Sequence, residues 1–490
     1  MHSPSSQPVT LADSISREYL VHHRVCPKAF AADGTIIVAI SANAHLDAID
    51  DIAFAYRCAV ATEITPDEEV ERLIERLTNR TERSIELARA DGEIDDFTAD
   101  VRDLANQVPV VRYVNLLVRD AYDAGASDIH LEATRNGLAA RFRLDGVLAP
   151  APEPPGELHH AIVSRIKLLA ELDIAERRRP QDGRIRVRLE ARELDLRVST
   201  VPTMYGESVV LRLLDRGGRP VGLDELGMPA GVLAAVSHIA KRPHGMVLVT
   251  GPTGSGKTTT LYATLQTRDR VAEKIVTVEE PIEYQLAGIT QVPVHRQASV
   301  TFGAALRSIL RQDPDVIMVG EMRDAETAEI AVQAAMTGHL VFSTLHTNDA
   351  IGAVPRLLDL TIPDYLVAAT LEAVLAQRLV RRICDDCRME YSPSPEHVAV
   401  VSGKPAGRVT LSKGAGCPSC RGTGFRGRVG LFELLTIDDA MREAIVRNAP
   451  RAELRKLGEE SGMRPMQHDG WQKIEAGLTT VEEVLRVVQT

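Results

Sequence analysis

Residues 251–258 read Gly-Pro-Thr-Gly-Ser-Gly-Lys-Thr, a spacing of glycine, lysine and threonine that suits the binding of phosphate groups. The segment follows a short apolar run, Met246–Thr250, and precedes a predicted helix. Its glycines let successive backbone N–H groups point at phosphate oxygens, and the helix N-terminus adds positive partial charge. We expect Lys257 to neutralise the outer phosphates of ATP and the Thr258 hydroxyl to ligate Mg²⁺. The residues predicted to line this nucleotide site are Gly251, Pro252, Thr253, Gly254, Ser255, Gly256, Lys257, Thr258 and Thr259.

Two groups of carboxylates follow predicted strands on the same edge of a sheet. Residues 279–283 (Glu-Glu-Pro-Ile-Glu) come after the run Ile275–Val278, and Glu321 comes shortly after Val316–Val319. Because the carboxyl ends of parallel strands meet at a ligand crevice, both groups could reach the magnesium ion or the attacking water. Carboxylates also end strands for structural reasons alone. Two such groups beside a complete phosphate loop nevertheless favour hydrolysis over mere binding.

Two histidines, His339 and His346, stand on either side of the fourth predicted strand. A histidine at a strand end can hydrogen-bond to phosphate, but it can equally be a packing or capping residue, so both interpretations stay open. Arg307 and Arg311 are four residues apart and share a helix face. They could reach a nucleotide across a subunit boundary, or pair with the aspartates that follow them.

Four of the six cysteines form two C-x-x-C pairs, Cys384 with Cys387 and Cys417 with Cys420. Four thiolates in this pattern suit a structural Zn²⁺ with a closed tetrahedral shell. A redox-active pair is the alternative, but two pairs together favour the metal. Because zinc binding supplies the folding energy of such a region, loss of any one thiol should unfold it.

The composition is that of a soluble globular protein, with 490 residues of which 44% are hydrophobic and 26% charged. The net charge of −11 and the 4% aromatic content argue against nucleic acid as a partner. No apolar run approaches the roughly 18–20 residues that span a bilayer, and the first residues lack a signal-peptide pattern. We expect a cytoplasmic protein whose membrane contact is indirect.

A strand–helix alternation begins at about residue 221. Four apolar runs are separated by helical patterns, which predicts a parallel sheet covered on both faces. The predicted helices lie near 257–267, 303–312 and 325–337. A small N-terminal α/β unit is indicated by the apolar run Thr35–Ile40 and by a helix whose inward positions would be Val70, Leu73, Ile74 and Leu77.

Between these units the sequence predicts an α+β domain with a mainly antiparallel sheet. Polar and apolar residues alternate around the turn Asp145-Gly146 and again in 183–201, and the apolar spacing over Leu158–Arg178 predicts a helix. Arginines such as Arg184 and Arg197 lie on one strand face, where simple solvation is as good an interpretation as ligand binding. The expected divisions are an N-terminal domain over 1–90, an acidic linker over 91–105, the α+β domain over 106–220, the ATPase core over 221–378, a tetracysteine zinc insertion over 379–425 and a helical C-terminal region over 426–490.

Together these motifs resemble those of the type II secretion system ATPases, within the wider family of secretion and pilus motor ATPases. The resemblance runs from about residue 106 to the end of the chain. It rests on Ala126–Glu132, Arg141–Gly146, Pro180–Ile185, Gly251–Thr258, Thr277–Glu283, Arg311–Asp315, Gly320–Asp324, Thr337–Val341, Thr344–Thr347 and the four cysteines. It implies a RecA-like P-loop ATPase core joined to the arginine-bearing second domain, and assembly as a homo-hexamer.

The resemblance also implies roles for single residues at the nucleotide. Glu321 would be the Walker B acid and Glu283 the glutamate that acts on water, with Lys257 on the phosphates. His339 and His346 would lie close to the phosphates.

Further nucleotide contacts are implied outside the phosphate loop. Arg184 and Arg197 of the second domain would reach the nucleotide, as would Glu279 of the acidic segment. That segment usually reads Glu-Asp-Pro, whereas this chain has Glu280 before the proline. A longer carboxylate there should still support activity.

The implied function is ATP hydrolysis that powers pseudopilus assembly and protein export across the outer membrane by a type II secretion system. The implied partners are the cytoplasmic domain of an inner-membrane secretion component, bound through the N-terminal domain, and the inner-membrane platform protein. The chain would then be peripheral on the cytoplasmic face of the inner membrane. The nearest alternative is a type IV pilus assembly ATPase that extends the pilus. A non-hydrolytic scaffold and a DNA-translocating motor are disfavoured by the complete set of site residues and by the acidic charge.

Overall fold

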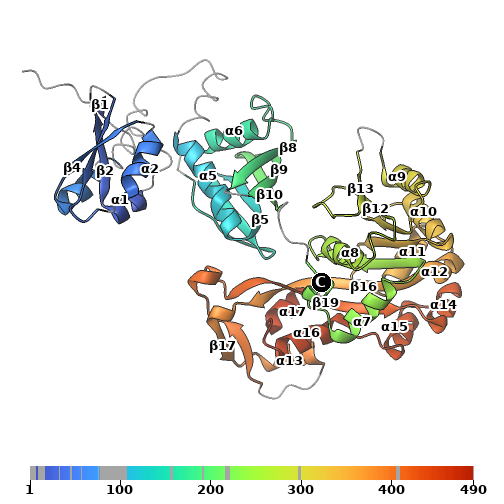
Figure 1. Cartoon of the computed structure of the whole chain (residues 1–490). Helices are drawn as coiled ribbons and strands as arrows, with labels where there is room; N and C mark the ends of the chain where they lie inside the picture. Colours follow the sequence, from blue (N-terminus) through green and yellow to red (C-terminus); the bar gives the residue numbers. More distant parts are fainter. Residues whose placement is uncertain are drawn as a thin grey trace, which may run out of the picture. The chain divides into compact units, whose positions relative to one another are not determined.

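The computed structural model describes residues 7–8, 17–31, 34–44, 47–56, 58–74, 77, 108–154, 158–189, 192–215, 221–295, 300–403 and 409–488. The chain divides into two compact units, Met1–Phe97 and Thr98–Thr490 (Figure 1). The acidic linker expected over 91–105 lies outside the described residues. None of the described helices is both long enough and apolar enough to cross a membrane.

The first unit is built on a four-stranded sheet in the order β1-β2-β3-β4. Only β3 and β4 are parallel neighbours. Residues 67–74 are helical, and Val70, Ile74 and Leu77 are buried in the same core as Ile36 and Val38, so the predicted α/β unit is confirmed. Its elements are β1 (Gln7–Pro8), α1 (Arg17–His23), β2 (Val25–Phe30), β3 (Ile36–Ile40), α2 (Asp47–Tyr56) and β4 (Val60–Ile64).

The second unit begins with a six-stranded antiparallel sheet in the order β7-β6-β5-β10-β9-β8, which confirms the predicted α+β domain. Two helices, α5 and α6, share a core with the inward residues of this sheet. Its elements are α5 (Val108–Asp123), β5 (Ala126–Thr134), β6 (Gly137–Leu144), β7 (Val147–Pro150), α6 (His159–Leu169), β8 (Gln181–Leu189), β9 (Arg192–Thr203) and β10 (Gly206–Asp215).

One helix of this domain is shorter than its sequence predicts. The apolar spacing extends to Arg178, but α6 ends at Leu169. Glu171 adopts the left-handed conformation with a φ of 57°, which a continuing helix does not allow. Asp173 then accepts a hydrogen bond from the backbone N–H of Ala175 at 2.9 Å, so its side chain stabilises a turn in place of another helical turn.

The rest of the second unit is built on a seven-stranded sheet in the order β13-β12-β14-β15-β11-β16-β19. Six strands are parallel, as predicted, and β19 pairs antiparallel with β16 at one edge. The four predicted strands correspond to β11, β12, β14 and β15, whereas the other three have no counterpart in the sequence prediction. The strands are β11 (Gly245–Thr250), β12 (Ile275–Glu279), β13 (Thr290–Pro293), β14 (Val316–Val319), β15 (Leu340–Leu345), β16 (Leu371–Ile383) and β19 (Phe425–Thr436).

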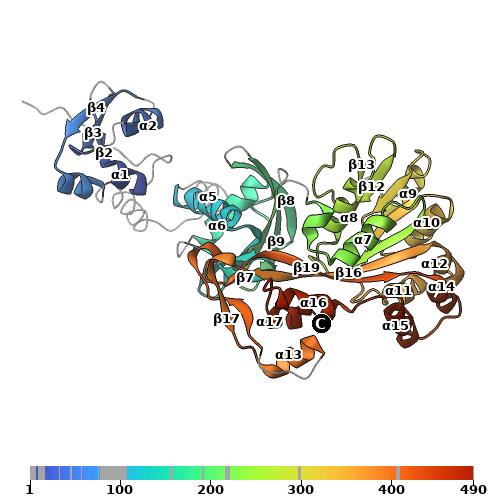
Figure 2. The same cartoon turned by 60° about the horizontal axis from the view of Figure 1, so that its bottom comes forward.

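Helices cover both faces of this sheet (Figures 1 and 2). Met246 and Leu248 of β11 belong to the core formed with α9, α10 and α12, while Val247 and Val249 belong to the core formed with α7 and α8. Burial on both faces explains why the central strands are apolar throughout. The helices are η1 (Leu223–Leu226), α7 (Ala230–Ile239), α8 (Lys257–Gln266), α9 (Phe302–Ile309), α10 (Ala325–Met336), α11 (Ala353–Asp359) and α12 (Asp364–Thr370).

Strands β16 and β19 form one long ladder, and the cysteine-bearing region lies between them in the sequence (Figure 2). That region contains the two-stranded sheet β17–β18 and helix α13, and four C-terminal helices follow β19. The elements are η3 (Asp385–Cys387), β17 (Arg388–Tyr391), α13 (Pro395–Ser402), β18 (Leu411–Gly414), η4 (Pro418–Cys420), α14 (Asp439–Val446), α15 (Arg451–Glu460), α16 (Met466–Glu475) and α17 (Val481–Val488).

Candidate nucleotide site and metal centre

The glycine-rich loop connects β11 to α8, and its backbone approaches neighbouring atoms too closely for larger residues. Gly256 precedes α8 with a φ of 87°, and a Cβ atom on Gly251 would lie 2.4 Å from the carbonyl oxygen of Gln377. The Ser255 hydroxyl is buried and has no hydrogen-bond partner among the residues that the structure describes. A cradle of backbone, an unpaired hydroxyl and a helix N-terminus fit a bound phosphate group.

The other residues predicted for this loop are open to solvent or lie in the first turn of α8. Pro252, Thr253 and Gly254 are exposed, and Thr258 and Thr259 are half-buried. The loop is therefore accessible from outside while its base is buried.

The Lys257 ammonium lies inside the loop. Its Nζ donates hydrogen bonds to the carbonyl oxygens of Gly251 at 2.8 Å and Pro252 at 3.1 Å. Burial lowers the pKa of Lys257 to about 8; Glu321 opposes this shift, and the positive charge of Arg378 adds to it. A polyanionic ligand in the loop would relieve the cost of this half-buried cation.

Two predicted residues from neighbouring strands converge on this lysine. Glu321 follows β14 and His346 follows β15, and the His346 Nε2 lies 3.6 Å from a Glu321 carboxylate oxygen. The Nε of Arg323 lies 2.7 Å from the same carboxylate. Burial and the charge of Lys257 lower the pKa of His346, although Glu321 acts in the opposite direction. The carboxyl ends of β11, β14 and β15 thus bring together a cation, an acid and an imidazole.

Glu279 is directed into the interior instead. Its carboxylate accepts hydrogen bonds from Tyr262, from the Thr277 hydroxyl at 2.5 Å and from Gln291 at 3.1 Å, and the side chain is almost fully buried. Burial raises the pKa of this carboxyl despite those hydrogen bonds. The structure gives Glu279 the role of an internal support for the acidic segment, which differs from the direct nucleotide contact that we expected.

The arginines of the α+β domain form a row across three strands. Arg197 of β9 lies opposite Arg184 of β8 on one side and Arg212 of β10 on the other. Burial lowers the pKa of Arg197, and the negative charge of Glu283 opposes that shift. The second domain therefore presents a half-buried guanidinium within electrostatic range of the acidic segment.

His339 is not brought to the phosphate loop, contrary to our expectation. His339 precedes Leu340, the first residue of β15, which pairs with Gly245 at the start of β11. His346 follows Leu345 at the other end of β15, which pairs with Thr250, the residue before the phosphate loop. β15 is six residues long, so its two ends lie about 17 Å apart. The His339 Nδ1 lies 2.9 Å from the carbonyl oxygen of Ala334 at the end of α10. Within one chain, His339 is a capping residue.

Arg307 of α9 and Arg311, two residues after the end of that helix, are held by neighbours other than the aspartates that follow them. Arg307 forms an ion pair with Glu326 at 2.6 Å, and Arg311 donates to the carbonyl oxygen of Arg307 at 2.9 Å. The Asp315 carboxylate accepts a hydrogen bond from the backbone N–H of Lys274 at 2.7 Å.

The four cysteines come together as their spacing predicts, with all four sulfur atoms within 4.8 Å of one another. The Sγ atoms of Cys384 and Cys417 are 3.8 Å apart, as are those of Cys387 and Cys420. A tetrahedral zinc with Zn–S bonds of about 2.3 Å requires sulfur atoms about 3.8 Å apart. The arrangement fits a structural zinc and is too wide for disulfides.

Two polar residues of β16 were missed in the sequence and lie under the phosphate loop. The Gln377 Oε1 accepts a hydrogen bond from the Thr260 hydroxyl of α8 at 2.6 Å. A guanidinium nitrogen of Arg378 would lie 3.2 Å from a Cβ atom on Gly251. The signal that could have found them is a Gln-Arg pair inside an otherwise apolar run.

The fold and the site define a class of protein: a P-loop ATPase core with a second, arginine-bearing domain and a tetracysteine region. Residues 103–486 match the family model described as type II/IV secretion system protein, and residues 3–84 match the MshEN domain. The chain belongs to the type II/IV secretion system protein family.

Individual relatives support this membership. The type II secretion system protein E of Xanthomonas campestris pv. campestris is 44% identical over 97% of this chain and 85% of its own length. The type IV pilus assembly ATPase PilB of Myxococcus xanthus is 42% identical over 96% of this chain and 85% of its own length. Among solved structures, the pilus retraction motor PilT with bound ADP is 27% identical, with a TM-score of 0.51. The match covers 78% of this chain and 96% of the PilT chain.

Proposed function

We propose that this chain is the motor ATPase of a type II secretion system and that it hydrolyses ATP to drive assembly of a pseudopilus and protein export. The observation that carries hydrolysis is the convergence of Lys257, Glu321 and His346 at the ends of three adjacent strands. The observation that favours secretion is the 44% identity to a type II secretion system protein E over almost the whole chain.

In this proposal each residue has a separate task at the nucleotide. Lys257 binds the outer phosphates, and Glu321 orients the groups around the terminal phosphate. Glu283 holds the attacking water and accepts its proton at a carboxylate oxygen. His346 donates a hydrogen bond to the terminal phosphate from its ring. Fixed charges of this kind stabilise the transition state because they need no reorganisation during the reaction.

We expect two metal ions in this protein, one at the nucleotide and one at the cysteine cluster. Magnesium would be held by the Thr258 hydroxyl, with Glu321 nearby, and would neutralise charge on the phosphates. Zinc would be held by the four cysteines as a structural ion. The chain contains the ligand residues that both metal sites require.

The second domain completes the proposed site with its arginines. Arg184 and Arg197 would contact the nucleotide, and the buried Nε of Arg197 has no partner among the residues described. Movement of this domain against the core would convert hydrolysis into mechanical work in a homo-hexamer.

The proposed partners link this chain to the inner membrane. Its N-terminal domain would bind the cytoplasmic domain of an inner-membrane secretion component, and the core would act on the platform protein, at the cytoplasmic face. A second candidate function is type IV pilus assembly, which the 42% identity to PilB over 96% of this chain favours.

Hydrolysis is tested by phosphate release from the purified chain with Mg-ATP. Lys257→Ala and Glu321→Gln should each lower turnover by about 100-fold or more, because each removes a charge on which the transition state depends. Lys241→Ala, at an exposed lysine of the same core, is the matched control. Undiminished turnover in Lys257→Ala or in Glu321→Gln would refute the proposed ATP hydrolysis.

The choice between secretion and pilus assembly is tested by the binding of partner domains. The full chain is used as bait against the cytoplasmic domains of the secretion component and of its pilus counterpart. Capture of the secretion domain alone supports secretion. Capture of the pilus domain alone would leave the ATPase chemistry standing and favour the second function.

A further inference from the structure

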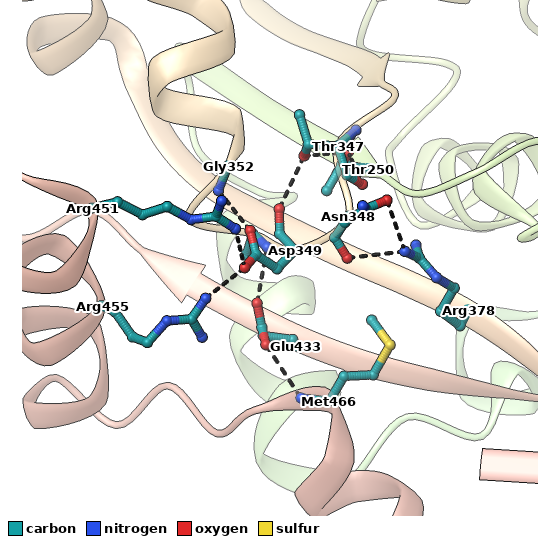
Figure 3. A network of polar contacts seen from close by, with 11 residues as sticks. Thr250, Thr347, Asn348, Asp349, Gly352, Arg378, Glu433, Arg451, Arg455 and Met466 are labelled. Carbon is teal, nitrogen blue, oxygen red and sulfur yellow. Dashed lines mark hydrogen bonds and ion pairs between the residues drawn. The ribbon is translucent and has the colours of Figure 1, made fainter. Parts of the chain in front are cut away.

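Residues 346–350, which we call the junction segment, follow β15 and form the first part of its connection to α11 (Figure 3). The segment is hydrogen-bonded to Thr250 beside the phosphate loop on one side and to arginines of β16 and α15 on the other. The backbone N–H of Thr347 donates to the Thr250 hydroxyl at 2.8 Å, and the two threonine hydroxyls are also 2.8 Å apart. Thr250 is the last residue of β11 and precedes the phosphate loop. The junction segment, which begins at His346, is therefore bonded directly to the residue before the phosphate loop.

Arg378 holds the junction segment from one side. This arginine of β16 is 6% exposed, and its Nη2 donates to the carbonyl oxygen of Asn348 at 3.1 Å and to the Asn348 side-chain oxygen at 3.4 Å. The same guanidinium lies against Gly251 and lowers the pKa of Lys257, after the larger effect of burial. One buried cation thus touches both the junction segment and the base of the phosphate loop.

Asp349 holds the segment from the other side. Its Oδ2 accepts hydrogen bonds from Arg451 at 2.6 Å and Arg455 at 2.5 Å, and its Oδ1 accepts from the backbone N–H of Gly352 at 2.8 Å (Figure 3). Burial alone would raise the pKa of Asp349, but these donors hold it below its ordinary value. The two arginines are one turn apart on α15, a helix of the C-terminal region.

A second carboxylate fixes the next residue of the junction segment. The Glu433 carboxylate of β19 accepts hydrogen bonds from the backbone N–H groups of Ala350 at 2.9 Å and Met466 at 3.2 Å. Met466 is the first residue of α16. The junction segment is thus attached to the C-terminal helices at two consecutive positions, while its other end is attached to the nucleotide site.

We propose that Asp349 and Arg378 are positioning residues of the nucleotide site, and that the Asp349–Arg451–Arg455 cluster lets the C-terminal helices control the placement of His346 and of the phosphate loop. The proposal rests on the proposed ATP hydrolysis. Neither residue needs to touch the nucleotide. A force on α15 would open the cluster, release the junction segment and withdraw His346 from Glu321.

The experiment measures steady-state ATP hydrolysis by full-length variants. Asp349→Asn keeps the size of the side chain but removes its charge, and Arg451→Gln with Arg455→Gln removes both cationic partners. Each should lower kcat about tenfold and change KM less than about threefold, because bound ATP is kept but misaligned. Lys456→Gln, at an exposed lysine of the same helix, should keep the wild-type kcat.

Rescue separates positioning by charge from simple packing. Arg451→Lys with Arg455→Lys keeps two cations beside Asp349 and should restore kcat to within about twofold of wild type. Because the three residues act as one unit, Asp349→Asn combined with the two glutamine substitutions should be no slower than Asp349→Asn alone. Both arginines are partly exposed, so their variants should fold even where the aspartate variant does not.

Two results would overturn the proposal. One is a wild-type kcat for Asp349→Asn or for the glutamine pair, and the other is a lysine pair as slow as the glutamine pair. Failure of the proposed hydrolysis has a different signature, namely a wild-type chain that binds nucleotide without turnover. In that case the preference for ATP over ADP in binding is the readout. It should fall at least about threefold in Asp349→Asn, and an unchanged preference would also refute the positioning role.

Discussion

The cysteine cluster gives the sharpest test of the link between sequence spacing and folded geometry. Its sulfur atoms already lie at the separations of a zinc tetrahedron, 3.6 Å for Cys417 and Cys420 and 3.8 Å for two other pairs. Apparent binding free energies of structural zinc are about 10–16 kcal/mol at neutral pH. A quarter of that, about 3 kcal/mol, corresponds to a loss of affinity of roughly two orders of magnitude. Cys384→Ser should therefore weaken zinc binding by about that factor.

The structural damage from Cys384→Ser should be local. The ladder of β16 and β19 runs from Ala373 opposite Thr436 to Ile383 opposite Phe425, and the cysteine loops lie in the sequence between these two strands. Those backbone hydrogen bonds need no metal. Loss of zinc should expose residues 384–424 to protease while the core sheet stays intact.

The assay combines metal analysis with limited proteolysis of the full chain. Wild type should carry one zinc per chain after exposure to a chelator that strips Cys384→Ser, and only the variant should then be cut within 384–424. Cys58→Ser, at a cysteine of the first unit, is the matched control and should behave as wild type. A Cys384→Ser variant that keeps its full zinc content under the same chelator would refute the closed four-thiolate site.

Two further predictions concern the nucleotide site. Burial lowers the pKa of Lys257 to about 8, so the ammonium group of the empty site loses its proton as the pH rises through that value. Above that pH, the affinity for ATP should fall by up to about tenfold per pH unit. Titration calorimetry up to about pH 9.5 can check this. An affinity that stays constant over that range would contradict the lowered pKa of Lys257. His346→Ala should lower kcat at least about tenfold, whereas His339→Ala should stay within about twofold of wild type. Equal losses in phosphate-release assays would show that the strand register does not decide which histidine serves the site.

The phosphate loop and the strands around it could be predicted from the sequence because their signals are local. The glycines, Lys257 and Thr258 stand within eight residues, and the apolar run before them is long enough for one buried strand. The parallel arrangement then requires that residues after β14 and β15 lie at the same edge as the loop. The structure places Glu321 and His346 there.

The difference between the two histidines could not be predicted because it depends on strand register. In the sequence, His339 and His346 flank one strand symmetrically. Only the pairing of Leu340 with Gly245, and of Leu345 with Thr250, shows which end faces the phosphate loop. A helical C-terminus that needs a cap then takes the other histidine.

Strand β16 was missed for a related reason. Residues 371–383 follow α12 directly and contain apolar residues at spacings that a buried helix would also show. The strand is fixed by its neighbours, β11 on one side and β19 on the other, and β19 begins more than 40 residues later. No local pattern can report such a pairing.

The distance between partners along the chain also explains why the phosphate loop could be predicted from the sequence, whereas the residues proposed to position it could not. A phosphate site needs several donors around one small anion, which adjacent residues can supply. A positioning residue must connect that site to another part of the fold, so its partners come from far along the chain. Asp349 is 102 residues from Arg451, and Arg378 is 30 residues from Asn348. Positioning residues should therefore be sought among buried charged side chains with distant partners, and Arg378 of the ATPase core fits that description.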